Sequence, residues 1–149
     1  MSVVVSTTGI KELDALFKAL PRSMDHKTWS AINFERSKVL VQKMKLTAPE
    51  GPTGNLVDSI GSVKLNAKKT ALGAVWTGPR RKGGHKGFAG HLVEFGTKSR
   101  KTKKGANRGV MPKKPFAKPS FIAVAPAMEN GLADSARKVI VRTAKRFLK

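Results

Sequence analysis

The sequence predicts a single α+β domain, in which helices near both ends of the chain pack on a small antiparallel sheet with long basic loops. Apolar residues recur at helical spacing near the two ends, whereas the middle alternates with the two-residue period of a strand. The order of helices, strands and a final helix favours α+β over a parallel α/β sheet. With 149 residues, of which 40% are hydrophobic, the chain fits one domain over residues 1–149.

Two helices are expected in the first third of the chain. Residues 2–5 form either a short strand or a pairing arm ahead of them. The apolar face of the first helix consists of Leu13, Leu16, Phe17 and Leu20. Pro21 should end this helix. Ser23 should cap the second, with Asp25 in its first turn, and Pro49 should end it.

The middle of the chain predicts a β-hairpin. Residues 56–65 are expected as one strand and residues 70–77 as the other, with a polar turn between them. Residues 79–90 follow as a mobile loop that contains four glycines. Residues 91–95 form a short ordered segment, for which the pattern leaves helix and strand open.

The last third contains a basic segment and then a helix. Residues 98–118 hold nine basic residues and no acid, which predicts a long hairpin or an extended loop, most of it within residues 98–114. Ser120 is expected to cap the last element, and Pro126 to interrupt it. From residue 127 onward, apolar residues recur at helical spacing.

The charge balance is the strongest global signal. Thirty Lys and Arg residues face nine Asp and Glu residues, which gives a net charge of +21. Between residues 59 and 128, sixteen basic residues accompany a single acid, Glu94. Such a surface repels itself and attracts polyanions, so we expect a nucleic acid or an acidic protein as a partner.

Composition also excludes several classes of protein. The chain has no cysteine, so neither disulfides nor Cys-ligated metals contribute. No apolar run approaches the roughly 20 residues that span a membrane, and residues 1–5 lack the basic start of a signal peptide. We therefore expect a protein made in a cytoplasm, without a membrane partner.

Candidates for catalysis or metal binding are few. The histidines are His26, His85 and His91, and His91 has an acid, Glu94, at helical spacing. Zinc sites need three or four ligands, and no third one follows nearby. The glycines of residues 79–90 match neither a P-loop nor a dinucleotide fingerprint. We predict no catalytic residue, no metal and no cofactor, and a protein that is not an enzyme.

The isolated carboxylate of Glu94 should find a cationic partner among its many basic neighbours. One interpretation is an ordinary surface ion pair, worth under about 1 kcal/mol. The other is an organising contact at a subunit interface or a turn. The sequence leaves both interpretations open.

Twelve basic residues in the two middle loops are candidate contacts to DNA or to an acidic partner, and solvated, solubilising loops are the alternative. They are Arg80, Arg81, Lys82, Lys86, Lys98, Arg100, Lys101, Lys103, Lys104, Arg108, Lys113 and Lys114. Only Phe88 and Phe116 flank these loops, so base stacking is not expected. Contact with backbone phosphates or with an acidic protein surface is favoured.

Three local patterns, in this order, resemble the neck or tail-completion proteins of long-tailed bacteriophages, also described as minor tail components. They are TAPEGPTGNLVDSI at residues 47–60, HLVEFGT at residues 91–97, and PKKPFAKP at residues 112–119, which Pro126 and Ala127 follow. The resemblance spans roughly residues 9–148. It assigns structural roles to Pro49, Thr53, Gly54, Leu56, Ser59, Glu94, Phe95, Gly96, Thr97, Pro115, Phe116 and Pro119.

The resemblance implies a structural protein of the virion. It would join the tail to the DNA-filled head as a homo-oligomeric ring around the DNA channel, with six-fold symmetry usual in this region. Its neighbours would be the head-completion or connector protein and the tail-terminator or tail-tube protein. The runner-up is a sequence-nonspecific nucleic-acid-binding protein that acts through its basic loops, and an enzyme such as a nuclease ranks third.

Overall fold

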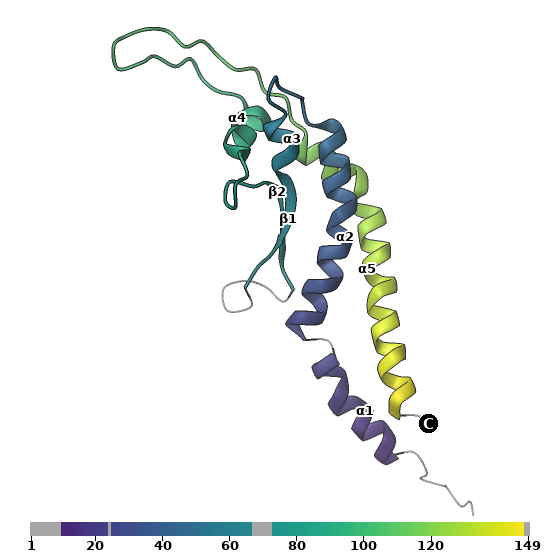
Figure 1. The fold of residues 1–149 in the computed structure, drawn as a ribbon. Helices are drawn as coiled ribbons and strands as arrows, with labels where there is room; N and C mark the ends of the chain where they lie inside the picture. Colours follow the sequence, from purple (N-terminus) through teal and green to yellow (C-terminus); the bar gives the residue numbers. More distant parts are fainter. Residues whose placement is uncertain (1–9, 24, 67–72, 148–149) are drawn as a thin grey trace, which may run out of the picture.

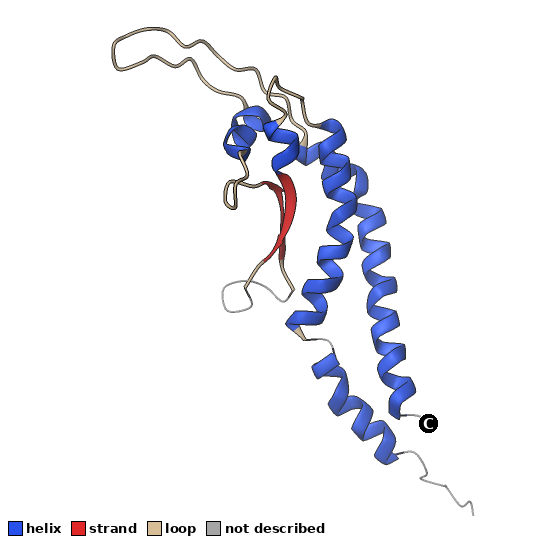
Figure 2. Ribbon diagram, in the orientation of Figure 1, coloured by secondary structure: helices blue, strands red, loops and turns tan. Residues whose placement is uncertain are grey.

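The structure is a computed structural model that describes residues 10–23, 25–66 and 73–147. Its helices and its two-stranded antiparallel sheet confirm the predicted α+β class. The molecule is elongated. The long helices form one side, the sheet and the short helices lie on the other, and a hairpin projects at one end (Figures 1 and 2). Within the described ranges, no helix combines the length and apolar character needed to cross a membrane.

The first two helices are α1 (Ile10–Ser23) and α2 (His26–Thr47). The prediction that Pro21 ends the first helix and Ser23 caps the second is wrong. Proline lacks an N–H and crowds the carbonyl of the fourth residue before it, but its φ is helical, and α1 runs on for two residues. Asp25 is the N-cap of α2 instead, because its carboxylate accepts a hydrogen bond from the Thr28 N–H at 2.8 Å.

The apolar face predicted for α1 is buried only in part. Leu16 is 8% exposed, whereas Phe17 is 62% exposed and points away from the core. The side chain of Leu13 lies outside the described residues. Because α1 packs mainly along α5, only a narrow stripe of it faces a neighbouring element.

The sheet consists of β1 (Ile60–Lys64) and β2 (Val75–Pro79), which confirms the predicted antiparallel hairpin. The prediction that its first strand begins at residue 56 is wrong, because Asn55–Ser59 form helix α3. Gly54, with a φ of 62°, turns the chain into this helix, and its carbonyl accepts from the Asp58 N–H at 3.1 Å. The second strand starts at residue 75 rather than 70, and residues 70–72 lie outside the described residues.

One face of the sheet packs on α2 through a chain of hydroxyl groups. The Oγ atoms of Ser37 and Ser62 are 2.7 Å apart, and the Ser62 Oγ is 2.9 Å from the Thr77 Oγ1. Because side chains alternate along a strand, Val63 and Trp76 lie on the other face. Each of them is 43% exposed, so this second face is open to solvent.

The core lies where α2, β1, the short helix α4 (Gly90–Phe95) and the last helix meet. The sequence left open whether residues 91–95 form a helix or a strand, and they are helical. The core cluster includes Met44 of α2 together with Ile60, Val93 and Phe116. Of the residues described, seven hydrophobic side chains are buried, which is a small core for a chain of this length.

The longest helix, α5 (Ala117–Phe147), lies along α2 and α1, and α2 is the helix that covers the sheet (Figure 1). Two predictions for α5 are wrong. Ser120 is not its cap but lies fully buried inside it, 2.7 Å from the Thr47 hydroxyl. Pro126 does not interrupt the helix, because α5 contacts α2 both before and after the proline. Beyond the proline, Arg36 Nη2 donates to Ser135 Oγ at 2.7 Å.

Gly73 lies closely against α2. Its φ is +67°, and a Cβ at this position would clash with the Cβ of Trp29. Its carbonyl also accepts a hydrogen bond from Asn33 Nδ2 at 2.8 Å. A side chain here would therefore strain the backbone and push the strand away from the helix.

We expect Gly73→Ala to lower the free energy of unfolding by more than about 1 kcal/mol, because alanine disfavours this φ and meets Trp29. Gly51→Ala is the matched control, since nothing lies within 4 Å of its Cβ position. Thermal unfolding followed by circular dichroism measures both. Equal Tm values for the two variants would contradict the role assigned to Gly73.

Candidate functional site

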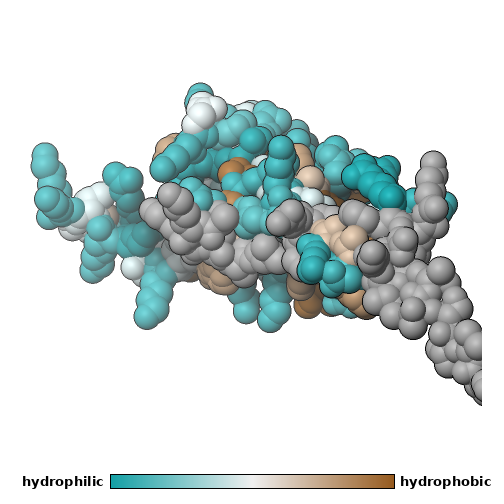
Figure 3. Space-filling model, turned by 90° about the horizontal axis from the view of Figure 1, so that it is seen from below, coloured by the Kyte–Doolittle hydropathy of each residue, from teal (hydrophilic) through white to brown (hydrophobic). Residues whose placement is uncertain are grey.

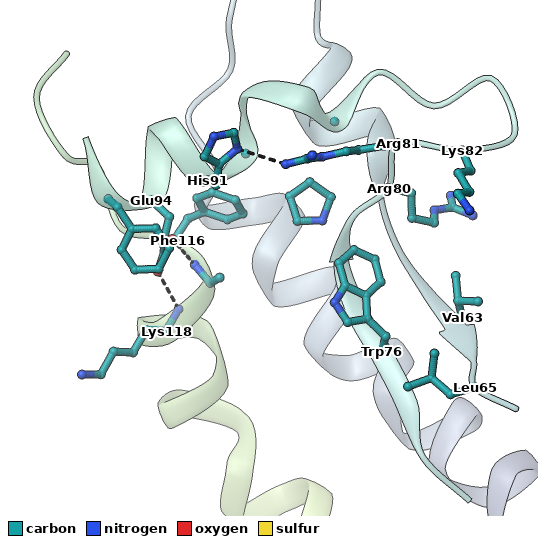
Figure 4. A pocket seen from close by; sticks show the side chains of 15 residues that line it. Val63, Leu65, Trp76, Arg80, Arg81, Lys82, His91, Glu94, Phe116 and Lys118 are labelled. Atoms are coloured by element: carbon teal, nitrogen blue, oxygen red, sulfur yellow. Dashed lines mark hydrogen bonds between the residues drawn. The ribbon is translucent and has the colours of Figure 1, made fainter. Parts of the chain in front are cut away.

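The candidate site is organised by the carboxylate of Glu94, which caps the N-terminus of α5. Its Oε2 accepts hydrogen bonds from the N–H groups of Phe116 at 2.7 Å and Ala117 at 2.9 Å, and its Oε1 accepts one from Lys118 at 3.1 Å (Figure 4). α5 has no acidic residue in its own first turn. A carboxylate at this point satisfies N–H groups that the helix leaves unpaired and faces the positive end of its dipole.

The prediction that Glu94 pairs with a cationic side chain is wrong for the described residues. Their two ion pairs, Lys18–Asp14 and Lys38–Glu35, lie elsewhere. Backbone N–H groups take the place of the expected Lys or Arg. Glu94 is only 9% exposed. This burial raises its pKa, but the hydrogen bonds from Ala117, Phe116 and Lys118 outweigh the effect, so the pKa lies below its ordinary value.

The hairpin that follows α4 is anchored beside this cap. The Lys114 N–H donates to the Val93 carbonyl at 2.8 Å, and the Thr97 N–H donates to the Met111 carbonyl at 3.0 Å. Gly96 links helix to hairpin with a φ of +73°, and a Cβ there would lie 2.9 Å from the Met111 oxygen. The Glu94 cap, the start of α5 and the hairpin base therefore form one hydrogen-bonded unit.

Residues 97–111 fold back on themselves and project from the body as an irregular hairpin (Figure 1). Lys101 and Asn107 form an isolated antiparallel bridge near its tip. Seen from below, this projecting part is mostly hydrophilic (Figure 3). Eight exposed basic side chains lie on the hairpin and its base: Lys98, Arg100, Lys101, Lys103, Lys104, Arg108, Lys113 and Lys114. We call them the hairpin cations.

The other four predicted contacts lie in a different place. Arg80, Arg81 and Lys82 line a groove of about 810 Å³ between the open face of the sheet, α4 and the start of α5, and Lys86 does not line it (Figure 4). The loop that carries them is folded tightly against β2. A Cβ at Gly87 would lie 2.6 Å from the Arg80 carbonyl oxygen. A Cβ at Gly90 would lie 2.6 Å from the Pro79 ring, so two of the four loop glycines have a packing role.

The histidines do not form a metal site within the described part of the chain. No group of three or more His, Cys, Asp or Glu residues there is placed to hold a metal ion. The Nδ1 of His91 accepts a hydrogen bond from Arg81 Nη2 at 3.2 Å, on the surface beside the groove. His91 and Glu94 share α4, but the Glu94 oxygens are directed at the start of α5.

The residues that carry the phage-protein resemblance are mostly architectural. Leu56 packs against the core, and Ser59 and Phe116 are almost completely buried. Thr53 and Gly54 lead into α3 and not directly into the strand that was predicted from residue 56. Pro119 lies in the first turn of α5 and not ahead of it.

Sequence reasoning missed an exposed apolar patch at the base of the hairpin. Phe95, Pro115, Pro119 and Ile122 line a shallow depression together, and we call this set the α4–α5 patch. Phe95 is 78% exposed and Ile122 is 62% exposed. The spacing of apolar residues in α5 could not indicate this patch, because its residues come from two helices and a loop.

We expect Glu94→Gln to lower the free energy of unfolding by about 1–3 kcal/mol at neutral pH, because the amide loses the charge that strengthens three hydrogen bonds. The folded pKa lies below the ordinary value of 4.5. The extra stability is therefore complete above that value and is lost as the pH falls through the folded pKa.

Denaturant unfolding between neutral and strongly acidic pH measures this difference. Glu129→Gln is the matched control, since it removes the same charge from an exposed position on α5. The gap between the wild type and Glu94→Gln should close at low pH. A gap that is independent of pH would show that the carboxylate charge does not stabilise α5.

The comparisons with known proteins do not place the chain in a family. No protein-family model matches it, and neither curated proteins nor solved structures include a similar one. Two surfaces of this chain are the candidates for its function. These are the hairpin cations with the adjoining α4–α5 patch, and the groove beside the sheet.

Proposed function

We propose that the protein is a non-enzymatic structural subunit of the neck of a long-tailed bacteriophage, where copies form a ring around the DNA channel at the head–tail junction. The observation that carries the proposal is the position of the α4–α5 patch at the base of the basic hairpin. An apolar patch that joins subunits would bring their hairpins together. Such a concentration of positive charge needs a polyanion beside it.

The apolar surface supports the idea of a subunit. Among the described residues, twelve large hydrophobic side chains are exposed and seven hydrophobic side chains are buried. Contiguous exposed apolar surface marks sites of association. A ring needs two different surfaces that meet between successive copies. The α4–α5 patch is our candidate for one of them, and the resemblance at residues 47–60, 91–97 and 112–119 supports a place in the phage neck.

The hairpin supports contact with the phosphate backbone of DNA. No carboxylate lies among its cations, and its apolar residues are Ala106 near the tip and Val110 and Met111 at the base. It has no aromatic side chain, which is the usual platform on which bases stack. Long, flexible, positively charged side chains on a narrow ribbon favour sequence-independent contact with phosphates.

We expect Ile122→Asp to weaken self-association at least tenfold, because a carboxylate would be buried in the apolar contact. Val141→Asp is the matched control, since Val141 is 49% exposed on the same helix, roughly 28 Å further along it. Sedimentation velocity measures the oligomer.

Electron microscopy of infected cells completes the test: without the protein, full heads and unjoined tails should accumulate, and Ile122→Asp should fail to restore virions. Complete virions in its absence would sink the proposal.

A second candidate, a nucleic-acid-binding protein that acts as a monomer, rests on the hairpin cations alone. We expect Lys103→Gln with Lys104→Gln to reduce the slope of log K against log salt by about 0.9 for each phosphate that the hairpin no longer neutralises. Lys27→Gln with Lys45→Gln changes the net charge equally on α2 and should leave the slope unchanged. Equal effects of both pairs would show that net charge, not the hairpin, governs binding. Tight DNA binding by monomeric Ile122→Asp at physiological salt would favour this second candidate.

A further inference from the structure

The groove beside the sheet combines an apolar floor with a cationic rim. Its floor includes Val63 and Trp76 from the open face of the sheet and Phe116 from the core (Figure 4). Trp76 is 43% exposed, although the large side chain of tryptophan is highly buried on average in folded proteins. In the described structure no element of the chain covers this face of the sheet opposite α2.

The rim carries positive charge without a free counterion among the described residues. Arg80, Arg81, Lys82 and Lys118 line it, and the one carboxylate that reaches the groove belongs to Glu94. Both oxygens of that carboxylate already accept backbone hydrogen bonds from the start of α5. The field in the groove therefore favours an anionic occupant.

The two arginines are held in place before anything binds. Arg80 Nε donates to the Ser59 carbonyl at 3.2 Å, and its guanidinium lies against Gly61, where a Cβ would come within 2.7 Å of it. Arg81 Nη2 donates to His91 Nδ1 at 3.2 Å. Each guanidinium keeps further N–H donors for a carboxylate. Side chains that are already ordered lose less entropy when a partner binds.

We propose that this groove binds an acidic segment of a partner protein, in which Asp or Glu residues flank one or two large apolar side chains. The apolar side chains would lie on the floor beside Trp76, and the carboxylates would pair with Arg80 and Arg81. A nucleic acid fits less well, because the floor is mainly apolar and offers few polar groups to the edges of a base. A second copy of this chain also fits less well, since it has nine carboxylates against thirty cations.

The test uses the full chain and three fluorescently labelled probes. The first is a peptide of about twelve residues in which glutamates flank two leucines, the second has serines in place of the leucines, and the third is an oligothymidylate. Fluorescence anisotropy should show the first peptide binding at least tenfold more tightly than the second. Equal binding of the two peptides would show that charge alone is recognised and would overturn the proposal.

Three variants locate the binding surface. Trp76→Ala and Arg81→Glu should each weaken binding of the leucine peptide by about tenfold or more, because each removes one half of the recognition. Lys45→Glu makes the same change of charge on α2, away from the groove, and should leave binding within about twofold. Arg81 is exposed, so its replacement tests the groove even if Trp76→Ala alters the sheet.

The remaining outcomes distinguish the other occupants. If the oligothymidylate loses affinity in Trp76→Ala and the peptide does not, the groove is a nucleic-acid site. If Arg81→Glu abolishes self-association instead, the groove is the contact between subunits. Either result overturns the proposal. Neither decides the proposed neck role, which is tested through Ile122, because Ile122 belongs to the α4–α5 patch and does not line the groove, although Phe95 lines both.

Discussion

The hydrogen bonds from the start of α5 to Glu94 are the constraint on which both candidate surfaces depend. They join two segments that are 22 residues apart in sequence at the Phe116 contact. The same carboxylate fixes where α5 begins, sets Phe116 into the core and closes the base of the hairpin. One wall of the groove and the floor of the α4–α5 patch therefore follow from a single capped helix end.

This use of Glu94 also explains the charge of the surface. The only acid between residues 59 and 128 is directed inward at backbone N–H groups, and it forms an ion pair with none of the cations that the structure describes. Those cations then divide by their surroundings. On the hairpin they stand apart from aromatic side chains, which suits a phosphate backbone. In the groove they surround Trp76 and Phe116, which suits an acidic protein segment with apolar side chains.

The sequence predicted the features that depend on local pattern and missed those that depend on distant contacts. The α+β class, the β-hairpin and the end of α2 before Pro49 follow from periodicity and proline placement. The start of α5 was missed because its cap comes from another helix, and Ser120 offered a plausible local substitute. Pro126 was misjudged because contacts from Arg36 and Thr47 outweigh a local helix breaker. The groove combines two strands, a loop and two helices, so no single stretch of sequence could indicate it.

Because the patch lies at the base of the hairpin, association of subunits in the proposed ring would also bring the hairpin cations of neighbouring copies together. Residue Phe95 precedes the hairpin and Pro115 follows it, so copies joined through the patch would hold their hairpins close together. Repulsion between the hairpin cations would then oppose association, and a polyanion that binds several hairpins at once would relieve it. By reciprocity, DNA would promote assembly by the same factor by which assembly promotes DNA binding. The net charge of +21 would thus weaken the ring in the absence of DNA, and DNA beside the hairpins would strengthen it.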